Sequence, residues 1–291
     1  MKHDTFGFII LILSSLIYAS YGIFSKIIGS SFAPFTQAWT KGVVSLICFL
    51  IFGSATKSFV KIDKKDLKWF ILVWTIGLLA IAPTFYSLVH LHIGTALFIQ
   101  YAATLITSYL IGIIFLKEKL AKESLMSLVI AFVGLLLVYW GDIYFNRLIP
   151  VLAAIISGSF FSIWFSFSKK VTSKYPTSEL NTLGYAFAVV TNLIIAFILG
   201  EKLNTHFASK EWLANIGYGL AGFLGSGLTI YGFKYIDAHK GSIILLSEIV
   251  FGTLSGIFLF REQLGFATII GGALIVFSVA LLNIPSLFQK I

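Results

Sequence analysis

Two stretches decide how the chain folds: TLITSYLIGIIFLKEKL at residues 104–120 and EIVFGTLSGIFLFREQL at residues 248–264. They align without a gap at an offset of 144 residues. The identities include Gly112 with Gly256, Ile113 with Ile257, Glu118 with Glu262 and Leu120 with Leu264. After its first residue, each stretch carries no charge until a basic residue and a glutamate near its end, so we predict a duplicated helical unit.

Long apolar runs continue on both sides of these two stretches. Of the 291 residues, 58% are hydrophobic and 11% are charged, whereas a soluble domain is roughly 45–50% apolar and about 25% charged. A bilayer core about 30 Å thick needs around 20 apolar residues in a helix. Ten runs reach or approach that length: 6–28, 34–54, 68–89, 94–116, 123–141, 148–168, 180–200, 212–233, 241–260 and 264–284. The sequence therefore predicts an all-α membrane protein with ten transmembrane helices.

The offset between the two stretches spans five of these runs. Because five is an odd number, the second copy enters the membrane from the opposite side. We therefore predict two inverted five-helix repeats, at residues 5–141 and 148–285. Inverted repeats are a common plan of secondary transporters, and a duplicated scaffold or membrane enzyme is the alternative.

The basic residues indicate an orientation in the membrane. With the N-terminus in the cytoplasm, 15 of the 21 Lys and Arg residues lie in cytoplasmic segments and five in the opposite connections, as the positive-inside rule requires. This distribution explains the net charge of +9 better than nucleic-acid binding, which needs a basic patch with base-reading residues. We expect an integral, multi-pass protein of a bacterial plasma (inner) membrane with both termini in the cytoplasm.

The ends of the two stretches, FLKEKL at 115–120 and FLFREQL at 258–264, resemble a signature of the EamA-type, ten-span branch of the drug/metabolite transporter superfamily. Gly134 and the glycines of 265–272 resemble the glycine-bearing last helix of each repeat. The resemblance implies export or exchange of amino acids, metabolites or drugs by alternating access. It also implies coupling to protons or a counter-substrate, without catalysis or a cofactor. Leu105 and Ile249 stand where the family usually has proline, which predicts straighter helices.

Two charged residues lie inside the apolar runs, where an ionisable group is costly and so is a candidate for function. Glu248 could bind an amine or carry a proton, because burial favours the neutral carboxyl group; alternatively, it pairs with a lysine and only holds helices together. Lys41 stands where the resembled family often has arginine. It could meet a substrate carboxylate, pair with Glu248, or extend its aliphatic stem to the membrane surface.

Other side chains within the runs can hydrogen-bond a substrate or hold an amine against an aromatic face. These candidates for substrate binding or proton coupling are Gln100, Tyr101, Tyr86, Tyr231, Trp39, Trp164 and Tyr18. Each aromatic residue is alternatively a packing residue. Glu118 and Glu262 lie at helix ends beside basic residues, which favours a structural or gating role over substrate contact.

Metal and disulfide chemistry are not expected. Cys48 is the single cysteine, so it can form no disulfide within the chain. His90 and His92 do not make a zinc site without further ligands. We predict no catalytic residue, no metal and no cofactor.

We expect a secondary transporter, an exporter or exchanger, of a small polar metabolite such as an amino acid or amine. The charges of Lys41 and Glu248 match the two charges of a zwitterion. The alternative is a multidrug or lipid-head-group transporter of the same fold, in which the two residues pair with each other. A membrane enzyme, scaffold or channel is less favoured, and we expect a monomer or weak dimer.

Overall fold

The computed structural model describes residues 2–91, 93–142, 147–261, 263 and 265–282, and these residues form helices and no strand. Glu262 and Leu264 of the second signature, His92, and the end of the second predicted repeat lie outside the described residues.

The first half contains α1 (Lys2–Ile28), α2 (Pro34–Ala55), α3 (Leu67–Leu79), α4 (Ile81–His90), α5 (Ile93–Ile114) and α6 (Lys122–Val138). A short 3₁₀ helix, η1 (Trp140–Asp142), follows. The second half contains α7 (Leu148–Thr172), α8 (Thr177–Ile198), α9 (Lys210–Phe233), α10 (Ala238–Leu245), α11 (Ser247–Phe260) and α12 (Phe266–Leu281). Each of the ten predicted apolar runs therefore carries helix, and the third and ninth runs carry two helices each.

Among the described residues, seven helical stretches are long and apolar enough to cross a membrane: Asp4–Ile28, Pro34–Ala55, Thr95–Ile114, Leu148–Thr172, Thr177–Ile198, Lys210–Phe233 and Ala238–Phe260. Shorter apolar helices cover Leu67–Gly77 and Phe266–Leu281. The prediction of an all-α membrane protein is confirmed by this architecture, and the count of ten spans stays a prediction.

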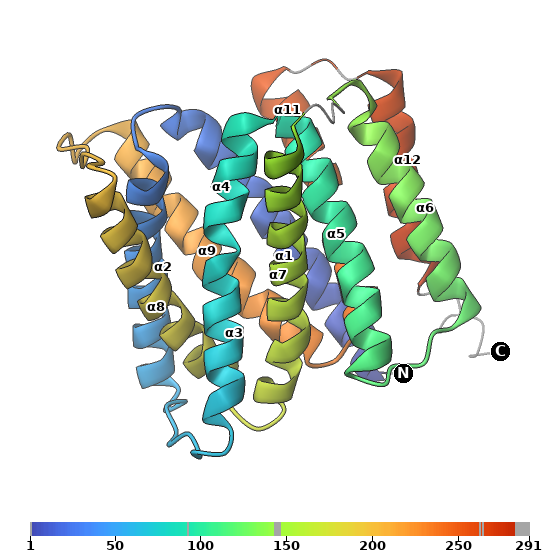
Figure 1. Cartoon of the computed structure of the whole chain (residues 1–291), viewed down its shortest axis with the longest axis horizontal. Helices are drawn as coiled ribbons and strands as arrows, with labels where there is room; N and C mark the ends of the chain where they lie inside the picture. The colour runs from blue at the N-terminus through green and yellow to red at the C-terminus, as the bar shows by residue number, and fades with distance from the viewer. Residues whose placement is uncertain (1, 92, 143–146, 262, 264, 283–291) are drawn as a thin grey trace.

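The break in the third run has a local cause. α3 ends at Leu79, and Pro83 lies in the first turn of α4. Because proline has no amide hydrogen, Pro83 cannot complete the helical hydrogen bond to the Leu79 carbonyl. The helical hydrogen bonding is therefore interrupted between α3 and α4, which continue one another in Figure 1.

The break in the ninth run was not expected. Straighter helices were predicted from Leu105 and Ile249, and α5 is continuous, but α10 and α11 separate at Leu246. Around this residue the amides of Leu246 and Ile249 bond the carbonyls three residues earlier, and Ser247 Oγ donates to the Ile244 carbonyl. These tighter bonds interrupt the regular α-helical pattern at Leu246 without proline, although Leu246 keeps right-handed helical angles and Ala238–Phe260 forms one apolar helical stretch. The expectation of straighter helices stays a prediction.

The main helix contacts join the first half to the second. α1 packs on α9, α10 and α11, while α7 packs on α3, α4 and α5. α2 packs on α8 and α6 packs on α12, at opposite sides of the bundle in Figure 1. If each helix is replaced by its counterpart in the other predicted repeat, the same pairs of helices are in contact. The two halves therefore pack into each other as one bundle.

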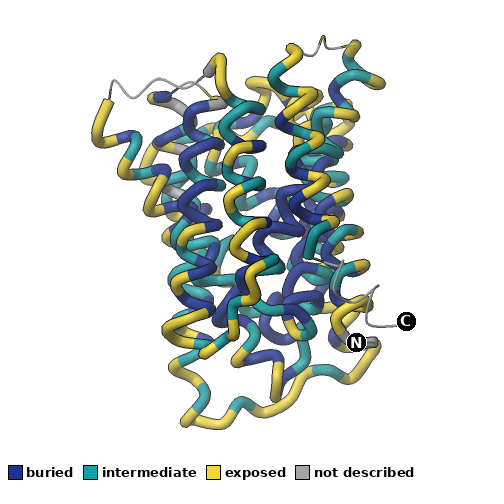
Figure 2. The backbone as a smooth tube through the Cα atoms, turned by 90° about the vertical axis from the view of Figure 1, so that its right-hand side faces the viewer, coloured by how far each residue is buried: buried dark blue, intermediate teal, exposed yellow. Residues whose placement is uncertain are grey.

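The periphery of the bundle is apolar. Phe197, Phe258 and Phe266 are 85%, 78% and 79% exposed, and exposed positions lie along the outside of the helices in Figure 2. Exposure of such side chains to water costs free energy, whereas in a bilayer they contact apolar lipid chains. The burial pattern agrees with the membrane environment that hydropathy predicts.

Candidate functional site

The break between α10 and α11 places Glu248 in the first turn of α11. The amino end of a helix carries a partial positive charge, which favours an acidic side chain there. Glu248 is half-buried, and the Tyr101 side chain of α5 lies beside its carboxyl group. The discontinuity thus holds a carboxyl group where two halves of the bundle meet.

Four tyrosines, Tyr18, Tyr21, Tyr185 and Tyr218, form a cluster next to Glu248, here called the tyrosine cluster. The rings of Tyr18 and Tyr21 lie 5.1 Å apart, and those of Tyr21 and Tyr218 lie 4.2 Å apart. Tyr18 and Tyr21 are both electrostatic neighbours of Glu248 and of Tyr185. The cluster therefore joins α1, α8 and α9, with its α1 tyrosines nearest the Glu248 carboxyl group.

Lys41 lies at the other side of the tyrosine cluster. Its Nζ is 3.7 Å from the centre of the Tyr218 ring and 5.2 Å from that of Tyr21. Among the described residues, no ion pair includes Lys41 or Glu248. The two opposite charges are thus separated by aromatic rings and hydroxyl groups.

Glycines of α9 make room for the tyrosine cluster. A Cβ atom at Gly222 would lie 3.2 Å from the Tyr185 hydroxyl and 3.3 Å from the Tyr21 hydroxyl. A Cβ atom at Gly225 would lie 2.7 Å from the Tyr18 ring. The glycine-bearing face of α9 is therefore the surface on which these side chains rest.

The structure brings together some of the predicted site residues. Tyr18 and Tyr101 adjoin Glu248, and Lys41 adjoins the same tyrosine cluster. Gln100 precedes Tyr101 on α5, and its Oε1 atom is buried without a hydrogen-bond partner in the described part of the chain. A buried acceptor of this kind can receive a bond from a ligand.

The other predicted residues lie elsewhere. Trp164 packs beside Gly77 of α3. Tyr86 is exposed and stacks on His90, while Tyr231 contacts Phe6 near the end of α9.

Trp39 is half-buried on α2, two residues before Lys41. This spacing is about 200° around the helix, so its side chain leaves α2 on roughly the opposite side. Trp39 is therefore not placed beside the ammonium group of Lys41.

Tyr185 and Tyr218 belong to the candidate site, and sequence reasoning missed them. Tyr185 donates a hydrogen bond to the Gly222 carbonyl over 3.1 Å. The signal that could have identified both is the glycine spacing at Gly219, Gly222 and Gly225, because three glycines on one helix face leave room for large side chains.

A second polar cluster lies near the ends of α5 and α7. The carboxyl group of Glu118 accepts hydrogen bonds from the Ala238 amide at 2.8 Å and from Lys169 at 3.4 Å. Its other oxygen lies 2.8 Å from His239 Nδ1. Burial alone would raise the pKa of Glu118, but the bonds from His239 and Ala238 and the charge of Lys169 hold this pKa below its usual value. The carboxylate is therefore the ionised centre of the cluster.

Neither cluster has the composition of a metal centre. Within the described ranges, no three His, Cys, Asp or Glu side chains come together as metal ligands would. The chemistry available at the tyrosine cluster is recognition of opposite charges, aromatic stacking and proton exchange at one carboxyl group.

A lipid-facing helical bundle with a polar site at a broken helix is the architecture of a membrane transporter. The sequence model of the EamA-like transporter family matches residues 5–140 and 148–284. The chain belongs to this family.

Similar proteins agree with this assignment. Two proteins from strains of Helicobacter pylori, each described as an uncharacterized transporter, are 28% identical over 98% of this chain and 97% of their own length. An uncharacterized transporter of Archaeoglobus fulgidus is 27% identical over 56% of this chain and 57% of its own. A crystal structure of a protein with 16% identity superposes with a TM-score of 0.83 over 99% of both chains, which shows a shared fold.

Proposed function

We propose that the protein is a secondary transporter, an exporter or exchanger, that moves a small polar metabolite by alternating access. The substrate is an amino acid or a related amine. The chain crosses a bacterial inner membrane ten times, as two inverted repeats at 5–141 and 148–285, with both termini in the cytoplasm.

The observation that carries this proposal is the separation of Lys41 from Glu248 by the tyrosine cluster. A zwitterion presents a carboxylate and an ammonium group to a site that holds an ammonium and a carboxyl group. Tyrosine rings hold the substrate amine or an attached apolar group without adding net charge. The site therefore complements both ends of an amino acid.

The packing of the helices supports the inverted repeats. α1 packs on α9, α10 and α11, and its counterpart α7 packs on the counterparts of those helices, α3, α4 and α5. Two similar halves that exchange equivalent contacts can close either face of a central site with similar energy. This equivalence is what alternating access needs.

Glu248 is the candidate for proton coupling. Its carboxyl group lies at a helix break beside Tyr101 and the tyrosine cluster. When one carboxylate binds either a proton or the substrate ammonium group, but not both, the proton and the substrate move in opposite directions. Loss of this charge removes the coupling.

Thermal-shift screening of the purified protein against amino acids, amines and nucleosides tests the substrate class. We expect amino acids to raise the melting temperature of the wild-type protein but not of Lys41→Gln. Stabilisation by hydrophobic cations that needs Glu248 but not Lys41 would instead favour the multidrug alternative. That alternative pairs Lys41 with Glu248, and these two residues form no ion pair here.

A further inference from the structure

Glu118 joins the two halves of the bundle at one membrane edge. It follows α5 of the first half, and its three donors belong to the second half: Lys169 on α7, and Ala238 and His239 on α10. The side chain of Glu118 is 5% exposed and that of His239 is fully buried. A single carboxylate thus holds two second-half helices against the end of α5.

Gly112 provides the seat for this carboxylate. The Glu118 amide donates to the Gly112 carbonyl over 2.8 Å, which folds the chain back on the end of α5. A Cβ atom at Gly112 would lie 2.6 Å from Glu118 Oε2 and 3.6 Å from His239 Nδ1. The absence of a side chain here lets the carboxylate reach α10.

His239 depends on this contact for its orientation. Its Nδ1 faces Glu118, while its Nε2 is buried without a partner in the described part of the chain. Asp237 adds an ion pair with Lys169 over 3.6 Å and with Lys240 over 3.3 Å. These groups form a charged cap over the start of α10.

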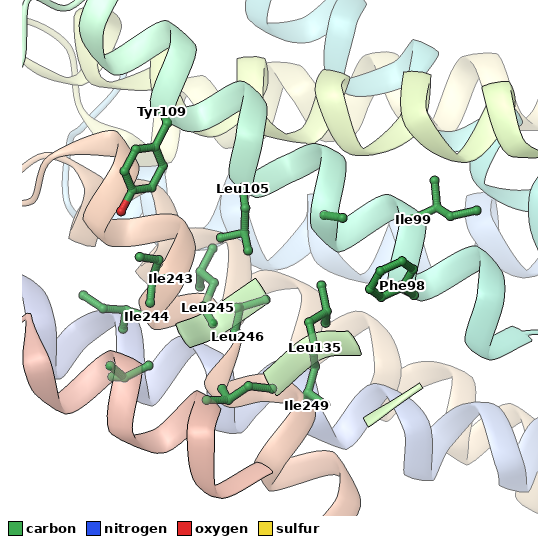
Figure 3. Close-up of a cluster of buried hydrophobic side chains, with 14 of the residues drawn as sticks. Phe98, Ile99, Leu105, Tyr109, Leu135, Ile243, Ile244, Leu245, Leu246 and Ile249 are labelled. Carbon is green, nitrogen blue, oxygen red and sulfur yellow. The ribbon is translucent and has the colours of Figure 1, made fainter. Parts of the chain in front are cut away.

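The bundle is closed immediately behind this cap. Ser108 of α5 and Ser242 of α10 are both buried, and their hydroxyl groups lie 2.6 Å apart. Deeper still, Leu105, Ile243 and Leu246 are almost fully buried, and Figure 3 shows these side chains gathered between α5 and α10. Leu105, Ile243 and Leu246, here called the apolar plug, therefore separate the cap from Glu248.

The burial of the chain changes at Glu248. Residues 241–247 are all buried, whereas Glu248, Tyr21 and Lys41 on the other side are half-buried. A surface hollow of about 420 Å³ lies over the cap and is lined by Glu118, Lys169 and Asp237 among others. The cap therefore borders a surface hollow, and the buried residues 241–247 lie between the cap and Glu248 along the chain.

We infer that Glu118 is the latch of a gate, and that breaking its bonds to α7 and α10 opens the Glu248 site toward the face on which Glu118 lies. This inference rests on the proposed alternating access, in which that face is cytoplasmic. Glu118 acts on the substrate only through the position of α10, so it is a positioning residue. Loss of the Glu118 carboxylate shifts the balance between the state open to the cytoplasmic face and the state open to the opposite face. It leaves the Glu248 site itself intact.

Thiol labelling from each side of the membrane tests the latch. The single cysteine is removed by Cys48→Ser, and Gly252→Cys places a thiol behind the plug, one helical turn beyond Glu248 on α11, where an added Cβ meets no atom within 4 Å. A membrane-impermeant maleimide is then applied to inside-out and right-side-out vesicles. We expect Glu118→Gln to raise the labelling rate from the Glu118 face about tenfold, the factor that corresponds to one charge-assisted hydrogen bond, and to lower the rate from the opposite face.

Two further variants make the result specific. Gly112→Ala displaces the carboxylate but keeps its charge, and we expect it to act in the same direction as Glu118→Gln. Glu123→Gln is the matched control, because Glu123 lies at the same edge in the first turn of α6 and forms no ion pair with a described residue. We expect it to leave both rates unchanged.

Unchanged rates in Glu118→Gln, or rates that rise from both faces, would overturn the latch, because the first shows no gate and the second shows general loosening. The assay contains no substrate. Reciprocal labelling together with an amino-acid screen that fails would leave the latch in place and reject the proposed substrate class.

Discussion

The ammonium group of Lys41 lies 3.7 Å from the centre of the Tyr218 ring. A cation on a ring face gains about 0.5–1 kcal/mol when exposed and about 2 kcal/mol when desolvated. An aromatic face does not neutralise the charge, so a carboxylate that approaches Lys41 still meets a full positive charge. Lys41 is therefore held in place and remains available.

Replacing Lys41 tests its role in recognising a carboxylate. We expect Lys41→Gln to weaken binding of an amino acid about tenfold or more, because a hydrogen bond to a charged group contributes about 1.5–3 kcal/mol. Calorimetry on the purified protein measures this change. Lys26→Gln is the control, since Lys26 also lies over a ring, 4.1 Å from the Phe260 centre, at the exposed end of α1. Equal loss in both variants would contradict the prediction.

Tyr218 can be changed so that its ring and its hydroxyl group are separated. We expect Tyr218→Phe to keep substrate affinity within about twofold, because the aromatic face over Lys41 remains. Tyr218→Leu removes that face and should weaken binding several-fold. If Phe and Leu have the same effect, the ring does not orient Lys41.

The tyrosine cluster needs the space left by Gly225 but not the space left by Gly227. Gly225→Ala would bring a Cβ atom to 2.7 Å from the Tyr18 ring, whereas at Gly227 the nearest atoms are 3.6 Å away. We expect Gly225→Ala to lower stability by about 1–3 kcal/mol through overpacking and to impair transport. Gly227→Ala is the matched control and should be neutral in thermal denaturation and uptake assays.

Glu248 should decide whether a proton gradient drives transport. We expect Glu248→Gln to abolish uptake driven by a pH gradient in liposomes while substrate exchange continues. Glu211→Gln is the control, because Glu211 also lies in the first turn of a helix. A Glu248→Gln protein that retains the full gradient-driven rate would remove Glu248 from the mechanism.

The low pKa of Glu118 predicts how the protein responds to acid. His239 and Ala238, together with Lys169, favour the ionised carboxylate in the fold and offset the effect of burial. A carboxyl group whose pKa is lower in the folded than in the unfolded protein stabilises the fold. Its full contribution is present above the pKa of the unfolded state, about 4.3 for Glu. The contribution is lost as the pH falls through the pKa of the folded state. We expect the wild-type melting temperature to fall more steeply below about pH 4.3 than that of Glu118→Gln. Parallel curves would contradict this linkage.

The helical architecture could be predicted because hydropathy and repeat offset are local properties of the sequence. Glu248 and Lys41 stood out for a similar reason: a charge in an apolar run is rare and costly. Tyr185 and Tyr218 could not be distinguished in this way, because the chain has 12 tyrosines in similar apolar surroundings. Only the packing of α8 and α9 selects them.

The break before Glu248 was missed because several hydrogen bonds cause it together and no single residue marks it. Pro83 marks its own break through one missing amide, but Leu246 has no such marker. Its tight turn depends on the Ser247 hydroxyl group and on short-range backbone bonds, which compete with the helix only in the packed structure. Neither break was predicted from the sequence, and only the one at Pro83 has a residue that marks it.

The contacts between the halves also constrain how the protein is made. Ser14 of α1 donates to the Gly225 carbonyl and Ser45 of α2 to the Gly219 carbonyl, and both acceptors lie on α9. During synthesis α1 and α2 leave the ribosome long before α9, so these hydroxyl groups must remain in the nascent chain without their final partners. The first half is therefore an assembly intermediate that depends on the insertion machinery until its complement arrives, and the two halves expressed as separate chains should find each other.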